Sequence, residues 1–217
     1  MLISFDYLFK KYNVNAKGVL HCGSSTGQEA EAYKAQGIEK VIWVEAIPEI
    51  FEGLLKHLDD VECSGPEVIC INACISDEDD KEVTFHVSSN EGQSSSFLEL
   101  GTHAIVHPNV TYIRDIKCTT KRLDTIFRES NFDIKDYPFI SFDLQGAEMF
   151  ALRGMGDLLK EVQYAYLEVN KDYLYRGCSL IEDIDDYMDQ YNLLRVETQW
   201  AGNTGWGDAF YVRKGLL

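Results

Sequence analysis

Short apolar runs alternate with amphipathic segments along most of the chain. Five apolar runs have the length of strands and few polar positions, as buried strands of a parallel sheet do. They lie at 18–22, 40–45, 67–74, 138–143 and 162–169. Five segments repeat apolar positions at helical spacing. They lie at 27–36, 48–58, 121–130, 146–160 and 179–191. Strands separated by helices in this order predict an α/β fold with parallel strands and right-handed crossovers.

The remaining patterned segments complete this picture. Residues 4–12 have Phe5 and Leu8 at helical spacing and predict a short helix that covers one edge of the sheet. The strand pattern also appears at 82–87, 110–119, 193–198 and 208–213. We expect the last two of these strands to form a closing pair.

A glycine turn follows the first predicted strand. Gly23 and Gly27 lack a Cβ atom, so the backbone can turn sharply and a ligand can approach it closely. Glu45 ends the second strand, where a carboxylate accepts hydrogen bonds from both hydroxyls of a ribose. The loop has the spacing of the D/E-x-G-x-G-x-G loop of S-adenosylmethionine (SAM) methyltransferases, at His21, Gly23, Ser25 and Gly27. It departs from the spacing G-x-G-x-x-G of dinucleotide-binding loops. Taken alone, the loop also fits an ordinary strand-to-helix turn.

Acidic residues end three of the predicted buried strands. They are Glu45, Asp143 and Glu168. The carboxyl ends of parallel strands face one edge of a sheet, so these side chains should converge there. Each one alone also fits a helix cap or a solvated charge. Together they predict a ligand crevice, and the polar serine-rich loop at 88–97 should lie beside it.

Length and charge narrow the class of protein. A chain of 217 residues suits one α/β domain spanning 1–217, and 45% hydrophobic residues exclude a disordered chain. A net charge of −16 repels phosphate backbones and anionic bilayers, so we expect no nucleic-acid and no membrane partner. The sequence has no signal-peptide pattern and no apolar run of about 18 residues. We therefore expect a soluble, cytoplasmic protein.

Seven ordered motifs resemble the FkbM-type SAM-dependent methyltransferases. They are HCGSSTG (21–27), WVEAIPE (43–49), NACIS (72–76), QSSS (93–96), DLQGAE (143–148), LEVN (167–170) and WGDAFY (206–211). The resemblance covers residues 18–213, after an N-terminal helical extension at 1–17. It implies a Rossmann-like class I methyltransferase fold, with a seven-stranded, mostly parallel sheet, an antiparallel last strand and helices on both faces. It also implies O-methylation of sugar or polyketide hydroxyls.

The resemblance also implies where the cofactor SAM binds. The turn after the first strand should lie under the methionine part of SAM, Glu45 should hold the ribose, and Asn72 should lie near the adenine. The implied cofactor-binding residues are His21, Gly23, Ser25, Gly27, Glu45 and Asn72. His21 stands where the family has an acid.

Asp143 corresponds to the first acid of the D-x-E-G-x-E motif of the family. Gln145 stands where that motif usually has a glutamate. The resemblance therefore implies no role at this position that depends on a negative charge.

Methyl transfer to a hydroxyl requires a group that withdraws the proton of the acceptor. Asp143 is the first candidate, either directly as a base or through a divalent ion. With Glu168 and Asn170 it offers the oxygen ligands that Mg²⁺ or Mn²⁺ prefers. His103 and His107 are the other candidate bases, because an imidazole titrates near neutrality.

We favour a SAM-dependent O-methyltransferase that acts on a hydroxyl of a sugar, a glycan or a small molecule. One alternative is an NAD(P)-dependent oxidoreductase, supported by the glycine turn and Glu45. The other is a catalytically silent SAM-fold interaction protein, with which His21 and Gln145 as substitutions are compatible.

Overall fold

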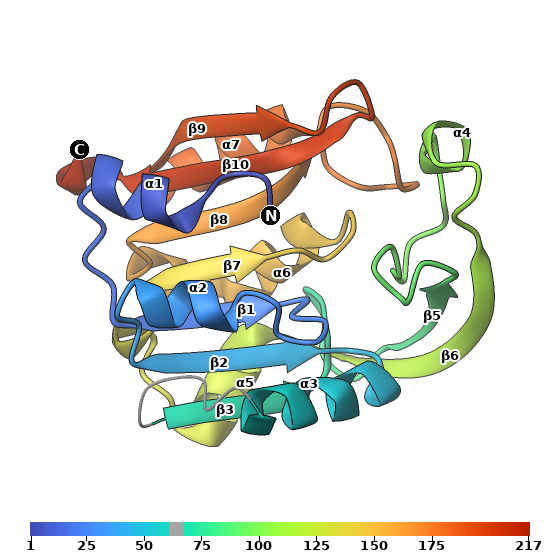
Figure 1. Cartoon of the computed structure of the whole chain (residues 1–217), viewed down its shortest axis with the longest axis horizontal. Helices are drawn as coiled ribbons and strands as arrows, with labels where there is room; N and C mark the ends of the chain where they lie inside the picture. Colours follow the sequence, from blue (N-terminus) through green and yellow to red (C-terminus); the bar gives the residue numbers. More distant parts are fainter. Residues whose placement is uncertain (61–66) are drawn as a thin grey trace.

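A seven-stranded sheet forms the centre of the computed structural model, which describes residues 1–60 and 67–217. Its strands are β1 (Gly18–Cys22), β2 (Lys40–Glu45), β3 (Glu67–Asn72), β7 (Phe139–Phe142), β8 (Tyr164–Asn170), β9 (Leu193–Trp200) and β10 (Trp206–Arg213). Their order in the sheet is β3-β2-β1-β7-β8-β10-β9 (Figure 1). The last strand, β10, runs antiparallel to both of its neighbours, and the other pairs are parallel. The predicted fold class is confirmed.

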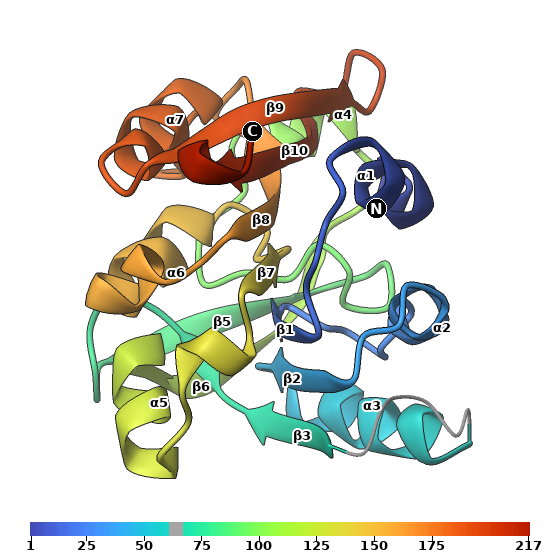
Figure 2. The same cartoon turned by 90° about the vertical axis from the view of Figure 1, so that its left-hand side faces the viewer.

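Helices cover both faces of this sheet (Figure 2). One face carries α1 (Phe5–Lys11), α2 (Ala30–Ala35) and α3 (Pro48–Asp60), and the other carries α5 (Leu123–Ser130), α6 (Glu148–Met155) and α7 (Ile181–Asp189). Each face has its own apolar core, because alternate strand residues point to opposite sides. Within the described ranges, no helix is both long and apolar enough to cross a bilayer.

The predicted helix boundaries differ from the observed ones by three residues or more in two helices. The helix predicted at 27–36 begins only at Ala30, because Gly27 has a φ of 78° and still belongs to the turn. The helix predicted at 146–160 ends at Met155, and Gly156, with a φ of 51°, begins a short 3₁₀ segment.

The N-terminal helix packs on a face of the sheet, so the prediction that it covers an edge is wrong. The Phe5 ring lies 5.8 Å from Phe139 and 5.4 Å from Tyr166, measured between ring centroids. Tyr12 lies 5.6 Å from Phe210 in the same way. Aromatic residues of three central strands offer a larger apolar surface than one edge strand does, and the apolar side of α1 is buried there.

Strand register aligns the functional positions on the face that α1, α2 and α3 cover. His21, Trp43, Ser141 and Tyr166 form one row across four strands. Side chains two residues further along a strand point to the same side. Those positions are Gly23, Glu45, Asp143 and Glu168, and Glu168 lies opposite Asp208 of β10. The carboxylates predicted from three strand ends therefore share one face and one edge.

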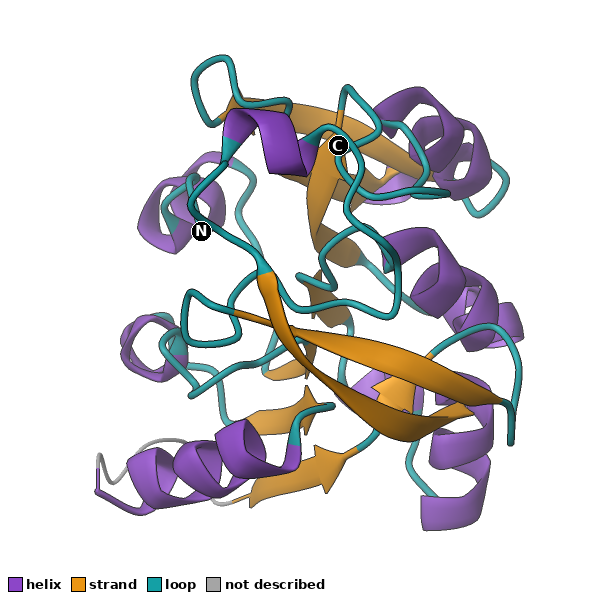
Figure 3. Cartoon of the chain, turned by 90° about the vertical axis from the view of Figure 1, so that its right-hand side faces the viewer, coloured by secondary structure: helices purple, strands orange, loops and turns teal. Residues whose placement is uncertain are grey.

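A second sheet lies beyond the carboxyl ends of the central strands (Figure 3). It consists of β4 (Cys74–Ile75), β6 (Tyr112–Lys121) and β5 (Glu82–Ser88) in that order. The strand predicted at 67–74 is therefore two strands in different sheets. They separate at Ala73, whose amide still bonds the Glu45 carbonyl. Between β5 and β6 the chain forms a polar loop and α4 (His103–Val106).

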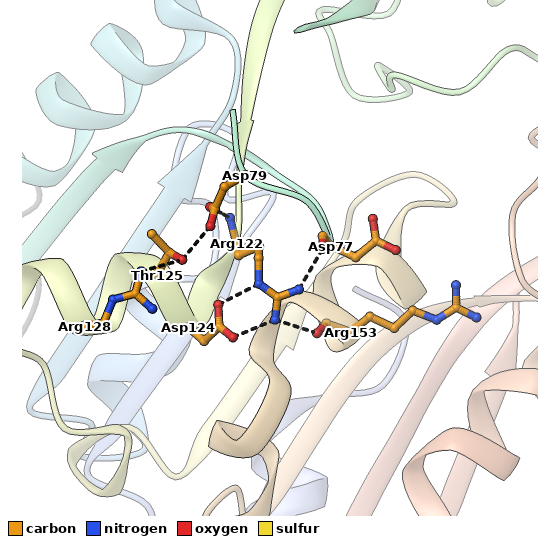
Figure 4. A network of polar contacts seen from close by, with 7 residues as sticks. All are labelled: Asp77, Asp79, Arg122, Asp124, Thr125, Arg128 and Arg153. Atoms are coloured by element: carbon orange, nitrogen blue, oxygen red, sulfur yellow. Dashed lines mark hydrogen bonds and ion pairs between the residues drawn. The ribbon is translucent and has the colours of Figure 1, made fainter. Parts of the chain in front are cut away.

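Arg122 fastens this small sheet to the helices behind the main sheet (Figure 4). Its guanidinium donates to the carbonyl oxygens of Asp77 and Arg153 and pairs with Asp124. The Asp79 carboxylate accepts the Arg122 amide, 2.8 Å away, and the Thr125 hydroxyl, 2.7 Å away, at the start of α5. The loop between β4 and β5 is thus tied to both α5 and α6.

Gly154 of α6 should be essential for this attachment. A Cβ atom there would lie 2.2 Å from the carbonyl oxygen of Ser76. Alanine normally stabilises a helix by about 1 kcal/mol relative to glycine. We expect Gly154→Ala to destabilise the protein by roughly 1–3 kcal/mol instead, because the small sheet must move.

Gly53 of α3 provides the matched control. A Cβ atom there would meet only a Thr26 methyl group at 3.6 Å, an ordinary contact. Gly53→Ala should therefore leave stability unchanged or raise it by up to about 1 kcal/mol. Chemical denaturation of both variants measures the difference, and equal effects would contradict the proposed clash.

Candidate active site

A cavity of about 360 Å³ opens at the carboxyl ends of the central strands. Residues from the ends of β1, β2, β7, β8 and β10 form its floor, and the loop after β5 and α4 line it as well. Its volume lies within the range of small-molecule and cofactor sites. The ligand crevice predicted from the strand ends is present, with the serine-rich loop beside it.

The β1–α2 turn packs closely against its neighbours. Gly23 has a φ of 78°, and a Cβ atom there would lie 1.7 Å from the carbonyl oxygen of Asp143. A Cβ atom on Gly27, also at a φ of 78°, would lie 2.8 Å from a Leu54 methyl group of α3. Gly23 and Ser25 line the cavity, whereas Gly27 does not. Gly27 therefore serves the packing of the turn.

Glu45 is held at the cavity by backbone amides. The amide of Ile47 donates to Oε1 at 2.8 Å, and the amide of Ser25 donates to Oε2 at 2.9 Å. Burial raises the pKa of Glu45 to about 7, against the effect of these hydrogen bonds. Each carboxylate oxygen retains a lone pair for a further donor. A pair of ribose hydroxyls matches this arrangement.

His21 lines the cavity as a neutral side chain. Its Nδ1 lies 3.0 Å from the Tyr33 hydroxyl, and its ring stacks on Trp43 at 5.1 Å between centroids. Burial lowers the pKa of His21 to about 3. His21 can thus contribute shape and a hydrogen bond but no charge.

Asn72 lies outside this cavity. Its side-chain amide donates to the carbonyl oxygens of Glu45, at 2.8 Å, and Ala46, at 3.2 Å. These bonds fix the backbone immediately after β2. Contact between Asn72 and adenine stays a prediction, and the observed hydrogen bonds join the Asn72 side chain to the backbone of Glu45 and Ala46.

Carboxylates dominate the charge of the cavity. Five of them line it: Glu29, Glu45, Asp143, Glu168 and Asp208. None of the described lining residues is a lysine or an arginine. Such a cavity attracts a cationic ligand and repels an anionic one.

Gln145 joins two of these carboxylates. Its Nε2 donates to Asp143 Oδ1 at 2.6 Å and to Glu168 Oε2 at 2.9 Å. Desolvation inside the cavity is the main cause that raises the pKa of Asp143, to about 6, and burial raises the pKa of Glu168 well above its usual range. Asp143 remains accessible to solvent from within the cavity, and its Oδ2 accepts no hydrogen bond from any described residue.

The predicted metal site of Asp143, Glu168 and Asn170 is not supported. Asn170 is fully buried, does not line the cavity and has no partner in the described chain for either polar side-chain atom. The Gln145 amide stands between the other two predicted ligands. Residues 1–60 and 67–217 contain no cluster of three or more His, Cys, Asp or Glu side chains arranged for a metal ion.

Both candidate histidines line the cavity from the segment around α4. The rings of His103 and His107 lie 4.9 Å apart between centroids. His103 is 4% exposed, and its Nδ1 has no hydrogen-bond partner among the described residues. Burial lowers the pKa of His103 to about 4, so its imidazole is neutral and weakly basic at pH 7. Asp143 has the pKa closer to that of an effective base near neutrality.

Several cavity residues were not found from the sequence. Asp208 could have been found from its alternation with Phe210 and Val212, which share its face of β10. Glu29 carries no comparable signal, because a turn brings it to the cavity.

Solved structures similar to this chain share the class I methyltransferase fold. Magnesium protoporphyrin IX methyltransferase from Synechocystis PCC 6803 with bound SAM has a TM-score of 0.53 at 11% identity, over 96% of this chain and 76% of that one. The METTL16 methyltransferase domain has a TM-score of 0.55 at 10% identity, over 95% and 65%. The ribosomal protein L11 methylase from Lactobacillus delbrueckii subsp. bulgaricus has a TM-score of 0.53 at 10% identity, over 95% and 74%. At these identities the likeness concerns the fold alone.

The family comparison reaches further than the fold. No curated protein sequence matches this chain. The family model described as the methyltransferase FkbM domain matches residues 21–193, from within β1 to the first residue of β9. Since this match covers most of the chain, the protein belongs to the FkbM family of SAM-dependent methyltransferases.

Proposed function

We propose that the protein transfers the methyl group of SAM to a hydroxyl of a sugar, a glycan or another small molecule, with Asp143 acting on that hydroxyl. The observation that carries the proposal is the Asp143 carboxylate at the end of β7. It is accessible from the cavity, one of its oxygens is free of hydrogen bonds from the described residues, and its pKa is about 6.

The charge of the cavity supports SAM as the ligand in preference to a dinucleotide. A pyrophosphate requires cationic or amide donors, and no lysine or arginine is among the described residues that line the site. SAM carries a positive sulfonium, which suits five lining carboxylates. The two Glu45 oxygens are oriented by backbone amides for ribose hydroxyls. The NAD(P)-dependent alternative therefore has less support.

SAM supplies a methyl group that the positive sulfur already activates toward a nucleophile. The protein must then align the acceptor and withdraw the proton of its hydroxyl. Alignment of the two reactants in the cavity provides effective molarities of about 10⁵–10⁸ M. Asp143 Oδ2 can take the proton as the oxygen–carbon bond forms and the carbon–sulfur bond breaks, with S-adenosylhomocysteine as the leaving group. This proton transfer contributes roughly 10²- to 10⁴-fold. Gln145 holds the other oxygen of Asp143 and so orients the carboxylate.

A catalytically silent interaction protein is the competing function. Its cavity would need no base with an accessible oxygen. Incubation with methyl-labelled SAM and a panel of glycans and small hydroxyl compounds, followed by mass spectrometry, separates the two functions. A product heavier by one methyl group supports the enzyme, and SAM binding without any transfer supports the silent protein.

Glu45→Ala should weaken SAM binding roughly tenfold or more, because two charge-assisted hydrogen bonds to the ribose are lost. Isothermal titration calorimetry measures the affinity, and a melting curve checks that the turn remains folded. Glu52→Ala, at an exposed position of α3, is the matched control and should bind SAM normally. Unchanged SAM affinity in Glu45→Ala would remove the assignment. Wild-type protein that binds NADH but not SAM would contradict the whole proposal.

Asp143→Asn should still bind SAM, while turnover at saturating SAM falls by roughly 10² or more, because the shape is preserved and the base is lost. Asp157→Asn, at an exposed position, should retain both properties. Chelator should not change the wild-type rate if the carboxylate acts without a metal. Near-normal turnover by Asp143→Asn would instead assign the base to His103 or His107.

A further inference from the structure

Gln145 occupies a backbone conformation that its residue type rarely adopts. Its φ is 53°, in the left-handed region, and Gly146 follows with a φ of 91°. The buried Glu148 carboxylate secures this turn by accepting the amides of Leu144, at 2.8 Å, and Gly146, at 3.3 Å. Strain of this kind persists where the surrounding structure requires it and gathers at functional sites.

The turn directs the Gln145 side chain to three partners at the cavity. Both N–H groups of Nε2 are used, one toward Asp143 and one toward Glu168. Its Oε1 accepts the Tyr175 hydroxyl at 2.6 Å. With the amide turned the other way, its oxygen would face two carboxylates. The hydrogen bonds therefore determine which atom of the Gln145 amide is the nitrogen and which is the oxygen.

Tyr175 connects this arrangement to the wall of the cavity. Its hydroxyl lies 3.5 Å from the carbonyl oxygen of Ser94, in the loop after β5. Its ring fills the space where a Cβ atom of residue 146 would lie, 2.8 Å from that position, so only glycine fits beside it. Gln145 is therefore held from two sides, by its own turn and by Tyr175.

We propose that Gln145 is a positioning residue that holds Asp143 and Glu168 together as an acidic pair for a cationic ligand, in the place where a divalent ion would otherwise join them. A divalent ion would neutralise both carboxylates. A neutral amide adds no positive charge and occupies one oxygen of each carboxyl group, so their other oxygens remain available to the sulfonium. The inference rests on SAM as the ligand of this cavity.

The first test asks whether Gln145 keeps a metal out. Gln145→Glu preserves the shape, removes both donors and places a third carboxylate between the other two. Three carboxylates suit Mn²⁺, so this variant should bind Mn²⁺ at least about tenfold more tightly than wild type. Electron paramagnetic resonance of free Mn²⁺ measures the binding. Gln190→Glu adds the same charge at an exposed position of the chain and should resemble wild type. Equal Mn²⁺ binding by Gln145→Glu and wild type would overturn the proposal.

The second test compares SAM with its product S-adenosylhomocysteine, which lacks the positive charge. In Gln145→Met the two carboxylates lose their shared donor and repel each other. SAM affinity should fall roughly tenfold, whereas affinity for the product should change by less than about threefold. A merely structural role would weaken both ligands equally.

Tyr175→Phe gives a second variant in case Gln145→Met does not fold. It keeps Gln145 and removes only the hydroxyl that holds Oε1. It should shift the ratio of the two affinities in the same direction, by less. Equal losses of both ligands would overturn the inference while leaving the methyltransferase function intact. Wild-type protein that fails to bind SAM would overturn the proposed function instead, and the Mn²⁺ test would still decide the role of Gln145.

Discussion

Carboxylates buried at strand ends, with no lysine or arginine among the described residues that line the cavity, are the constraint on which this site depends. A buried charge costs free energy unless hydrogen bonds stabilise it. The protein meets this requirement with neutral donors: backbone amides for Glu45 and Glu148, the Gln145 amide for Asp143 and Glu168, and the Tyr166 hydroxyl for Asp208. Neutral donors orient the carboxylates and leave the cavity negative. Two turns supply several of these donors. The β1–α2 turn provides the Ser25 amide, and the turn after β7 provides the Gln145 side chain.

The small sheet gives this arrangement its outer wall. It is fixed to α6, behind the main sheet, through Arg122 and through the close contact of Gly154 with the Ser76 carbonyl. The loop after β5 is further stabilised by its own serines, since the Ser95 hydroxyl accepts the Ser88 amide and the Ser88 hydroxyl accepts the Ser94 amide. A polar segment can therefore line a cavity while its backbone groups remain bonded. The packing of α6 on the main sheet therefore helps to fix the position of the small sheet, which forms the cavity wall.

Much of the fold and part of the site could be predicted from the sequence, for physical reasons. Buried parallel strands are recognised as short runs of apolar residues with few polar positions. The residue at the end of such a strand lies at the carboxyl ends of the sheet, as Glu45 and Asp143 do. Side-chain direction at that edge leaves no such pattern. Asn72 pairs in register with Glu45, yet its amide bonds the nearby carbonyl groups instead of facing the cavity. The metal prediction was not supported for a related reason: residue types identify donors, but only the left-handed turn at Gln145 determines what stands between them.

A glutamine is an uncommon choice for a left-handed position, and its neighbours explain why this chain tolerates it. Glycine would relieve the backbone but would leave Asp143 and Glu168 facing each other without a donor. Asparagine also tolerates this backbone but is one methylene shorter, and the Gln145 amide here reaches from β7 to β8 and to Tyr175. A lysine or arginine would neutralise the pair and compete with a cationic ligand. Only a long neutral side chain with two donors on one nitrogen and an acceptor beside it meets all three requirements, so the chemistry of the cavity selects the residue against the preference of the backbone.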